Sequence, residues 1–153
     1  MLRQRFNDAL KDAMKRRAEL EVGTIRMILA QLKDRDIAAR PKGVAEGIGD
    51  EEIAGMLQGM IKQRRESIEL FKKGGRQELV DKEEAEIRVI EGFLPKQMDE
   101  AEIKSAIEAV IAETGAKTIK DMGRSMALIK QRYAGRIDMA KAGAVLKQAL
   151  GAG

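Results

Sequence analysis

The sequence predicts an all-α protein built from two helical domains. Of its 153 residues, 44% are hydrophobic but only 3% are aromatic, so a core would consist of Leu, Ile, Val, Ala and Met. Apolar residues recur at the spacing of amphipathic helices, and no segment shows the alternation of a half-buried strand. We therefore expect an N-terminal domain of about four helices over residues 1–95 and a C-terminal three-helix bundle over residues 96–153.

The first two helices are expected before a glycine-rich loop. Apolar positions at helical spacing predict a first helix over residues 2–15. A second helix should run over residues 25–40, with Thr24 as its N-cap. Pro41 and the glycines that follow it predict an exposed loop that lasts to Gly49.

The third and fourth helices complete the expected N-terminal domain. Asp50 opens an acidic first turn, which suits the N-terminus of a helix, and Gly74-Gly75 ends that helix. A fourth helix is predicted over residues 77–94. Pro95 ends it, because proline lacks an N–H donor and disfavours helix at the preceding residue.

Three shorter helices are expected in the C-terminal domain. Asp99 and Glu102 have the spacing of a capping box, Thr118 can cap the next helix, and Asp138 can cap the last. Gly115 should end the first of these helices, and Gly135 should end the second in a position where a positive φ is usually required. The small-residue tail Gly151-Ala152-Gly153 should be frayed.

The composition excludes several kinds of chemistry. The chain has no Cys and no His, which rules out disulfides, thiolate nucleophiles, imidazole bases and Cys/His zinc sites. Ser67, Ser105 and Ser125 are interpreted as ordinary helical serines, since none lies in a glycine elbow. We predict no catalytic residue, metal site or cofactor.

Acidic residues also gather on the predicted fourth helix. This cluster consists of Asp81, Glu83, Glu84 and Glu86. Because basic residues are interspersed and no ligand loop is present, we interpret it as a solvated face rather than a site for a hard cation.

Basic residues dominate the C-terminal quarter of the chain. Lys117, Lys120 and Arg124 lie near the expected start of a helix, where free N–H groups would add to their attraction for phosphate. Arg132 and Arg136 flank the only tyrosine, which could stack on an unpaired base. The candidate nucleic-acid-binding residues are Lys117, Lys120, Arg124, Lys147, Arg132, Tyr133 and Arg136.

A purely structural role for these residues is an open alternative. In that case Arg136 would pair with Asp138, Tyr133 would pack in the core, and the other charges would only keep the domain soluble. The predicted third helix carries a second basic surface, which acidic neighbours dilute and which we interpret as solvated. It comprises Lys62, Arg64, Arg65, Lys72, Lys73 and Arg76.

The sequence predicts a soluble, cytoplasmic protein that does not bind membranes. No apolar run approaches the roughly 20 residues of a membrane span, and the N-terminus has no apolar secretion segment. The absence of Cys fits a reducing compartment.

Three motifs give the chain a family resemblance. They are Leu94-Pro95-Lys96-Gln97-Met98, Asp121-Met122-Gly123-Arg124-Ser125-Met126 and Gly135-Arg136-Ile137-Asp138. In this order and separation they resemble the GatB/YqeY family, and specifically a free-standing YqeY-like protein. Arg26-Met27 and Arg64-Arg65-Glu66-Ser67 extend the resemblance into the first half. Arg124 stands where the family usually has Lys, Met139 where it often has Gly, and Gly143 where it tends to have Ser or Asn.

The resemblance implies a helical C-terminal domain similar to the tail of the B subunit of the glutamine-dependent Asp-tRNA/Glu-tRNA amidotransferase. That tail is associated with engaging tRNA, which makes a tRNA- or RNA-binding accessory protein our leading hypothesis. The family is often labelled as carbon–nitrogen ligases with glutamine as amide donor, so participation in amide transfer is a second hypothesis. A third is a protein-interaction module that grips an aminoacyl-tRNA synthetase or an amidotransferase.

Overall fold

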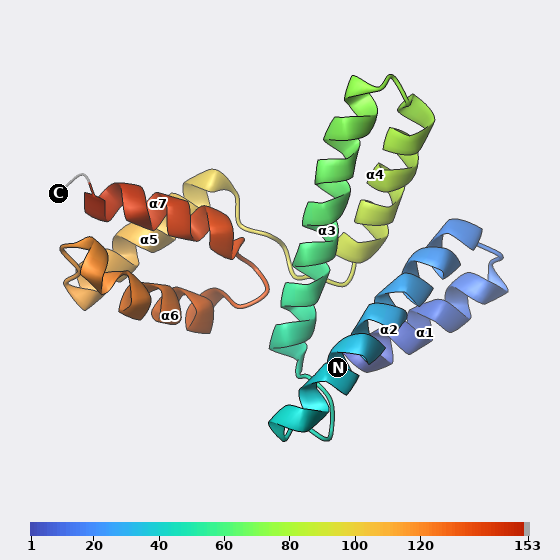
Figure 1. Ribbon diagram of the computed structural model, residues 1–153, viewed down its shortest axis with the longest axis horizontal. Coiled ribbons are helices and arrows are strands. Elements are labelled where there is room, and N and C mark those ends of the chain that lie inside the picture. Colours follow the sequence, from blue (N-terminus) through green and yellow to red (C-terminus); the bar gives the residue numbers. More distant parts are fainter. Residues whose placement is uncertain (152–153) are drawn as a thin grey trace. The chain divides into compact units, whose positions relative to one another are not determined.

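The computed structural model describes residues 1–151 and divides the chain into two compact units, Met1–Leu94 and a second that begins at Pro95 (Figure 1). Residues 1–151 contain helices and no strand, which confirms the all-α prediction. None of the helices in this range is long and apolar enough to cross a membrane. Ala152 and Gly153 of the predicted frayed tail lie outside the described residues, and Gly151 is the last residue of a helix.

The N-terminal unit, Met1–Leu94, consists of two helical hairpins. In the first, α1 (Leu2–Lys15) is followed by α2 (Glu19–Ala39), which continues into a 3₁₀ turn, η1 (Arg40–Lys42). In the second, α3 (Asp50–Lys73) packs along α4 (Gln77–Glu91), and α2 also packs against α4. The predicted fourth helix is three residues too long, because a turn at Gly92 and Phe93 ends it before Pro95.

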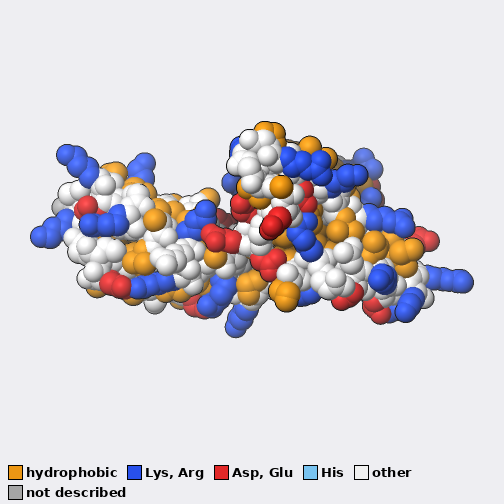
Figure 2. All heavy atoms as spheres, turned by 90° about the horizontal axis from the view of Figure 1, so that it is seen from below, with side chains coloured by type: hydrophobic (Ala, Val, Ile, Leu, Met, Phe, Trp, Pro, Cys, Tyr) orange, Lys and Arg blue, Asp and Glu red, His pale blue; other side chains and the backbone are white. Residues whose placement is uncertain are grey.

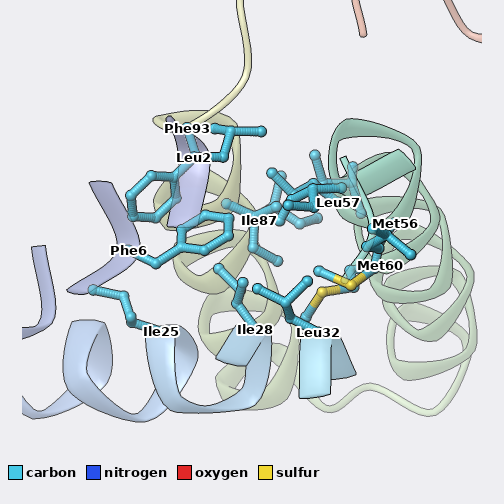
Figure 3. Close-up of a cluster of buried hydrophobic side chains, with 14 of the residues drawn as sticks. Leu2, Phe6, Ile25, Ile28, Leu32, Met56, Leu57, Met60, Ile87 and Phe93 are labelled. Atoms are coloured by element: carbon cyan, nitrogen blue, oxygen red, sulfur yellow. The ribbon is translucent and has the colours of Figure 1, made fainter. Parts of the chain in front are cut away.

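All four helices contribute to one core in this unit (Figure 3). Phe6, Ile28, Ile53, Leu57 and Ile90 are fully buried. The ring of Phe6 meets that of Phe93 edge to face, with centroids 4.8 Å apart, an arrangement that aromatic pairs prefer. The apolar stripes read from the sequence are therefore the faces that meet in this core.

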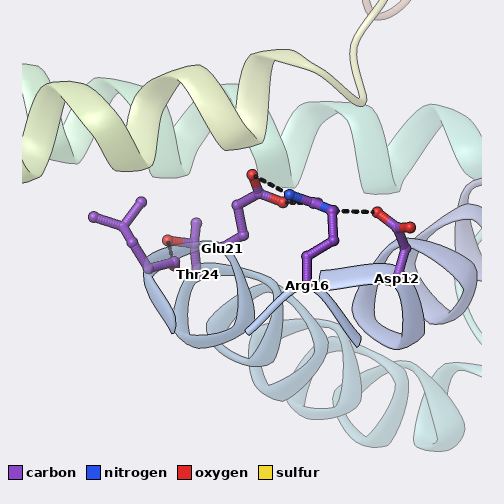
Figure 4. A network of polar contacts seen from close by, with 5 residues as sticks. Asp12, Arg16, Glu21 and Thr24 are labelled. Atoms are coloured by element: carbon purple, nitrogen blue, oxygen red, sulfur yellow. Dashed lines mark hydrogen bonds and ion pairs between the residues drawn. The ribbon is translucent and has the colours of Figure 1, made fainter. Parts of the chain in front are cut away.

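The prediction that Thr24 caps the second helix is wrong. Thr24 lies inside α2, where its hydroxyl donates to the carbonyl of Leu20 at 2.8 Å (Figure 4). The chain turns earlier, at Arg17, which has a φ of 56°. Arg16 stabilises this turn because its guanidinium binds both Asp12 on α1 and Glu21 on α2.

The predicted loop from Pro41 to Gly49 is exposed over most of its length but has a buried anchor, Ile48, with 4% of its surface exposed. The Ile48 N–H donates to Asp36 at 2.9 Å, and its carbonyl accepts from Arg3 at 2.8 Å. Arg3 also binds both carboxylate oxygens of Asp36 at 2.7 Å. We call the paired Arg3 and Asp36 the Arg3–Asp36 clasp. Gly47 has a φ of 96°, and a Cβ there would lie 2.6 Å from Arg3 Nη2, so glycine is required beside the clasp.

The interpretation of the α4 carboxylates as a solvated face is wrong for two of the four. Glu86 is 7% exposed and accepts from Nε of Arg64 at 2.9 Å, so Arg64 does not belong to a solvated basic surface either. Glu83 is half-buried, and burial together with the nearby Glu86 carboxylate raises its pKa.

The C-terminal unit is a bundle of three helices with a 3₁₀ turn. It comprises α5 (Glu100–Thr114), η2 (Ile119–Asp121), α6 (Met122–Tyr133) and α7 (Met139–Gly151). Ile107, Val110, Ile129 and Leu146 fill its core. The capping box of Asp99 and Glu102 is present, and Gly135 has the expected positive φ. Gly115 ends α5 as predicted, and it too has a positive φ.

The Arg3–Asp36 clasp should make the stability of the protein depend on acid pH. Hydrogen bonds from Arg3 and from the Ile48 N–H lower the pKa of Asp36 below its ordinary value of 3.8. The stabilisation is therefore complete above the unfolded-state pKa and is lost as pH falls through the lower folded-state pKa. We expect Asp36→Asn to reduce the free energy of unfolding at pH 7 by roughly 2 kcal/mol.

Urea denaturation at pH 7 and at several values below pH 4 measures both effects. Asp34→Asn is the matched control, because Asp34 is exposed on the same helix and should change stability by less than about 0.5 kcal/mol. Equal losses for the two variants would contradict a specific role for the clasp.

Candidate nucleic-acid interface

The Leu-Pro-Lys-Gln-Met motif fastens the start of the C-terminal unit to the turn between α6 and α7. Nε2 of Gln97 donates to the Gly135 carbonyl at 2.6 Å and to the Pro95 carbonyl at 3.0 Å. The Met98 N–H donates to the Arg136 carbonyl at 2.9 Å. Hydrogen bonds therefore join two of the three motifs behind the family resemblance. The motif residues that form these bonds have a structural role.

The Asp-Met-Gly motif caps the turn that leads into α6. The carboxylate of Asp121 accepts from the N–H of Lys117 at 2.9 Å and from that of Thr118 at 3.2 Å. These bonds lower the pKa of Asp121. The N–H groups of Lys117 and Thr118, just before the start of η2, are thus bound by a carboxylate of the chain itself.

The Gly-Arg-Ile-Asp motif starts the last helix. Oδ1 of Asp138 accepts from the N–H of Ala140 at 2.9 Å and from that of Lys141 at 3.2 Å, which confirms the predicted N-cap. Within residues 1–151 no ion pair joins Arg136 to Asp138, and the Arg136 side chain is exposed. The structural alternative considered for this pair is therefore not what the structure contains.

Three of the seven candidate residues are engaged within the bundle. Arg124 donates to the carbonyl of Thr114 at 3.2 Å and lies 3.6 Å from Asp121. Arg132 forms an ion pair with Glu113, which raises the pKa of the guanidinium. Tyr133 is half-buried and packs against the core of the unit.

Sequence reasoning missed the partners of these two arginines. Glu113 and Thr114 lie on α5, whereas both arginines lie on α6. Helical spacing identifies neighbours on one helix only, so the sequence contains no signal for such a contact.

The other four candidates are exposed lysines and an arginine whose side chains have no hydrogen-bond or ion-pair partner in the described part of the chain. They are Lys117, Lys120, Lys147 and Arg136. Exposed, unpaired cations keep their full charge for an external anion. These four are therefore the residues best suited to bind a polyanion.

The three lysines lie at the same end of the bundle. Lys117 precedes η2, and Lys120 is inside it. The last turn of α7 packs on η2, since a Cβ at Gly151 would lie 3.9 Å from Cδ1 of Ile119. Lys147 is one turn earlier on that face of α7. We call Lys117, Lys120, Lys147 and the neighbouring Arg124 the η2-end cluster.

Figure 2 shows Lys and Arg side chains projecting from the end of the C-terminal unit at the left of the view, the end at which η2 lies in Figure 1. Arg136 is at the other end of α6, whose 12 residues span about 18 Å. The seven predicted residues thus do not form one patch. The structure brings four of them together and separates Arg136 from that group.

The chain is similar to known proteins over nearly its full length. A family model described as "Yqey-like protein" matches residues 3–150. The chain is 34% identical over 106 residues to "Altered inheritance of mitochondria protein 41, mitochondrial" of Lachancea thermotolerans, which covers 68% of this chain and 54% of that protein. It is 32% identical over 136 residues to the protein of the same name from Pyrenophora tritici-repentis, covering 84% and 71%.

A third relative with this name, from Eremothecium gossypii, is 34% identical over 85 residues, which covers 56% of this chain and 44% of that protein. The chain thus spans about half the length of two of these relatives and seven tenths of the other. Their names place these relatives in mitochondria, so the expected cytoplasmic location of this chain gains no support from them.

The structural role of the first motif can be tested on stability. Gln97→Ala removes the side-chain bonds to the Gly135 and Pro95 carbonyls, and we expect a loss of about 1–2 kcal/mol in the free energy of unfolding. Lys96→Ala, at the exposed neighbouring position, should change it by less than about 0.5 kcal/mol. Denaturant titration of the full chain followed by circular dichroism measures both. A larger effect from Lys96→Ala would contradict this assignment.

Proposed function

The chain belongs to the YqeY-like protein family, and from this membership together with the η2-end cluster we propose that it is an accessory protein that binds RNA, with tRNA as the leading candidate. The observation that carries the proposal is the grouping of three exposed lysines without ion-pair partners among residues 1–151 at one end of a small bundle. A phosphate backbone is the ligand that such a group of cations favours.

The chemistry of the cluster predicts how the RNA is held. Lysine ammonium groups are compact point charges that attract phosphates without the fixed geometry that base recognition needs. Tyr133 packs against the bundle core and is not at this end, so base stacking on it is not part of the proposal. The cluster should therefore bind RNA through its backbone with little sequence selectivity.

The choice of tRNA among RNAs depends on the resemblance of this unit to the tail of the amidotransferase B subunit. Cytoplasm and mitochondria both contain tRNA, so the proposal does not depend on the compartment. Direct participation in amide transfer is supported by no contact among residues 1–151. Ser125, one of the three serines considered as nucleophiles, is fully buried and out of reach of a substrate.

Removing the three unpaired lysines tests the proposal. We expect Lys117→Gln/Lys120→Gln/Lys147→Gln to weaken tRNA binding roughly tenfold or more at moderate salt, because three phosphate contacts are lost. The slope of log K against log salt should become shallower by about 2 to 3. Fluorescence anisotropy of labelled tRNA over a series of salt concentrations gives both quantities.

The matched control is Lys62→Gln/Lys72→Gln/Lys73→Gln, which removes the same charge from exposed positions on α3. It should leave both the affinity and the salt slope close to those of the unmodified protein. Equal losses in the two triple variants would mean that only net charge matters. Absence of tRNA binding at low salt would refute the proposal itself.

A further inference from the structure

An apolar groove lies between the first hairpin and α4 of the N-terminal unit, and none of its lining residues belongs to the η2-end cluster. Its volume is about 620 Å³. It is lined by residues of α1, α2, α4 and the turn after α4, which are Ala9, Ala18, Glu19, Leu20, Glu21, Ile25, Ala85, Arg88, Val89, Gly92 and Phe93.

The groove has an apolar floor, and small residues lie among those that line it. Ile25 and Phe93 belong to the buried core, and Figure 3 shows both beside Phe6 at one side of the cluster. Arg5 fixes the turn that carries Phe93, since it donates to two carbonyls there at 3.0 Å and lies over the ring. Four of the lining residues, Ala9, Ala18, Ala85 and Gly92, have little or no side chain, which leaves space above the floor.

The rims of the groove carry charges of opposite sign. On α2, Glu21 is already paired with Arg16, but Glu19 is exposed and has no ion-pair partner within residues 1–151. On α4, Arg88 is likewise exposed and unpaired there. An occupant that matches this groove therefore needs a cation along its α2 edge and an anion along its α4 edge.

We propose that this groove binds an amphipathic helix of a partner protein. An apolar stripe on that helix would cover Ile25, Val89 and Phe93, with Lys or Arg facing Glu19 and Asp or Glu facing Arg88. A helix fits because it satisfies its own backbone hydrogen bonds, whereas an extended segment would meet no sheet edge here. The small residues Ala9, Ala85 and Gly92 let the backbone of that helix approach closely at their positions.

Nucleic acid does not suit this groove, because its floor is apolar and one rim is acidic. The proposal is therefore independent of RNA binding by the C-terminal unit. The N-terminal unit would then have a binding surface of its own. Because the two rims of the groove differ in charge, they would fix the direction in which the bound helix lies.

Photo-crosslinking in cells tests the occupant. A benzophenone amino acid replaces Ala85 in the groove of the full chain, and the same replacement of Ala101, exposed on α5, is the matched control. We expect adducts specific to the Ala85 position. Sequencing of the adduct should give a segment with apolar residues at i, i+3, i+4 and i+7, basic residues along one edge and acidic residues along the other.

Adducts at Ala85 only with a second copy of this chain, only with nucleic acid, or identical to those at Ala101 would overturn the proposal, as would no adduct at all. A synthetic peptide with the crosslinked sequence then gives the affinity by fluorescence anisotropy. Arg88→Glu and Glu19→Lys should each weaken it roughly tenfold, whereas Lys82→Glu, on α4 outside the groove, should leave it unchanged. An affinity that responds equally to Lys82→Glu and Arg88→Glu would refute the predicted edge charges.

Discussion

The C-terminal unit depends on side chains that satisfy the ends of its short helices. A helix leaves its first four N–H groups without intrahelical partners, and in helices of 12 to 15 residues this is a large share of the backbone. Asp99 and Asp138 accept from such groups of α5 and α7, and Asp121 accepts from N–H groups just before η2. Gln97 ties the entry of the unit to the turn before α7. These contacts stabilise the ends of the three short helices, which the apolar core packs together.

This requirement determines which residues remain for function. The acidic and amide residues of the three motifs are used as caps and ties, and Arg124 is partly used as well, because it binds the last carbonyl of α5. Motif residues that look functional in the sequence are therefore mainly structural. Cations outside the caps, above all Lys117, Lys120 and Lys147, keep their charge exposed, and they carry the capacity to bind a polyanion.

The sequence predicted the helices well because each has its own apolar stripe, and it predicted the C-terminal caps because those signals are local. The turn between α1 and α2 was missed because the residue with a positive φ there is Arg17 and not a glycine. Thr24 has the residue type of an N-cap but lies within α2. The pairs Arg64–Glu86 and Arg132–Glu113 join different helices. No pattern along the chain could have revealed them, since their geometry exists only after the helices pack.

The η2-end cluster and the groove of the N-terminal unit differ in the affinity and the selectivity that each could provide. Lysines that meet phosphates give affinity and rapid association but discriminate poorly among RNAs, so the η2-end cluster alone cannot select one RNA in a cell. On our proposal, the groove with its apolar floor and rims of opposite charge would select a partner helix by shape and by the order of its charges. If a partner protein bound to the N-terminal unit supplies the selectivity, weak contacts between the C-terminal unit and the RNA backbone are sufficient to hold the RNA. The reason is that linking two binding events raises the effective concentration for the second event. Neither of the two proposed binding events requires a catalytic residue.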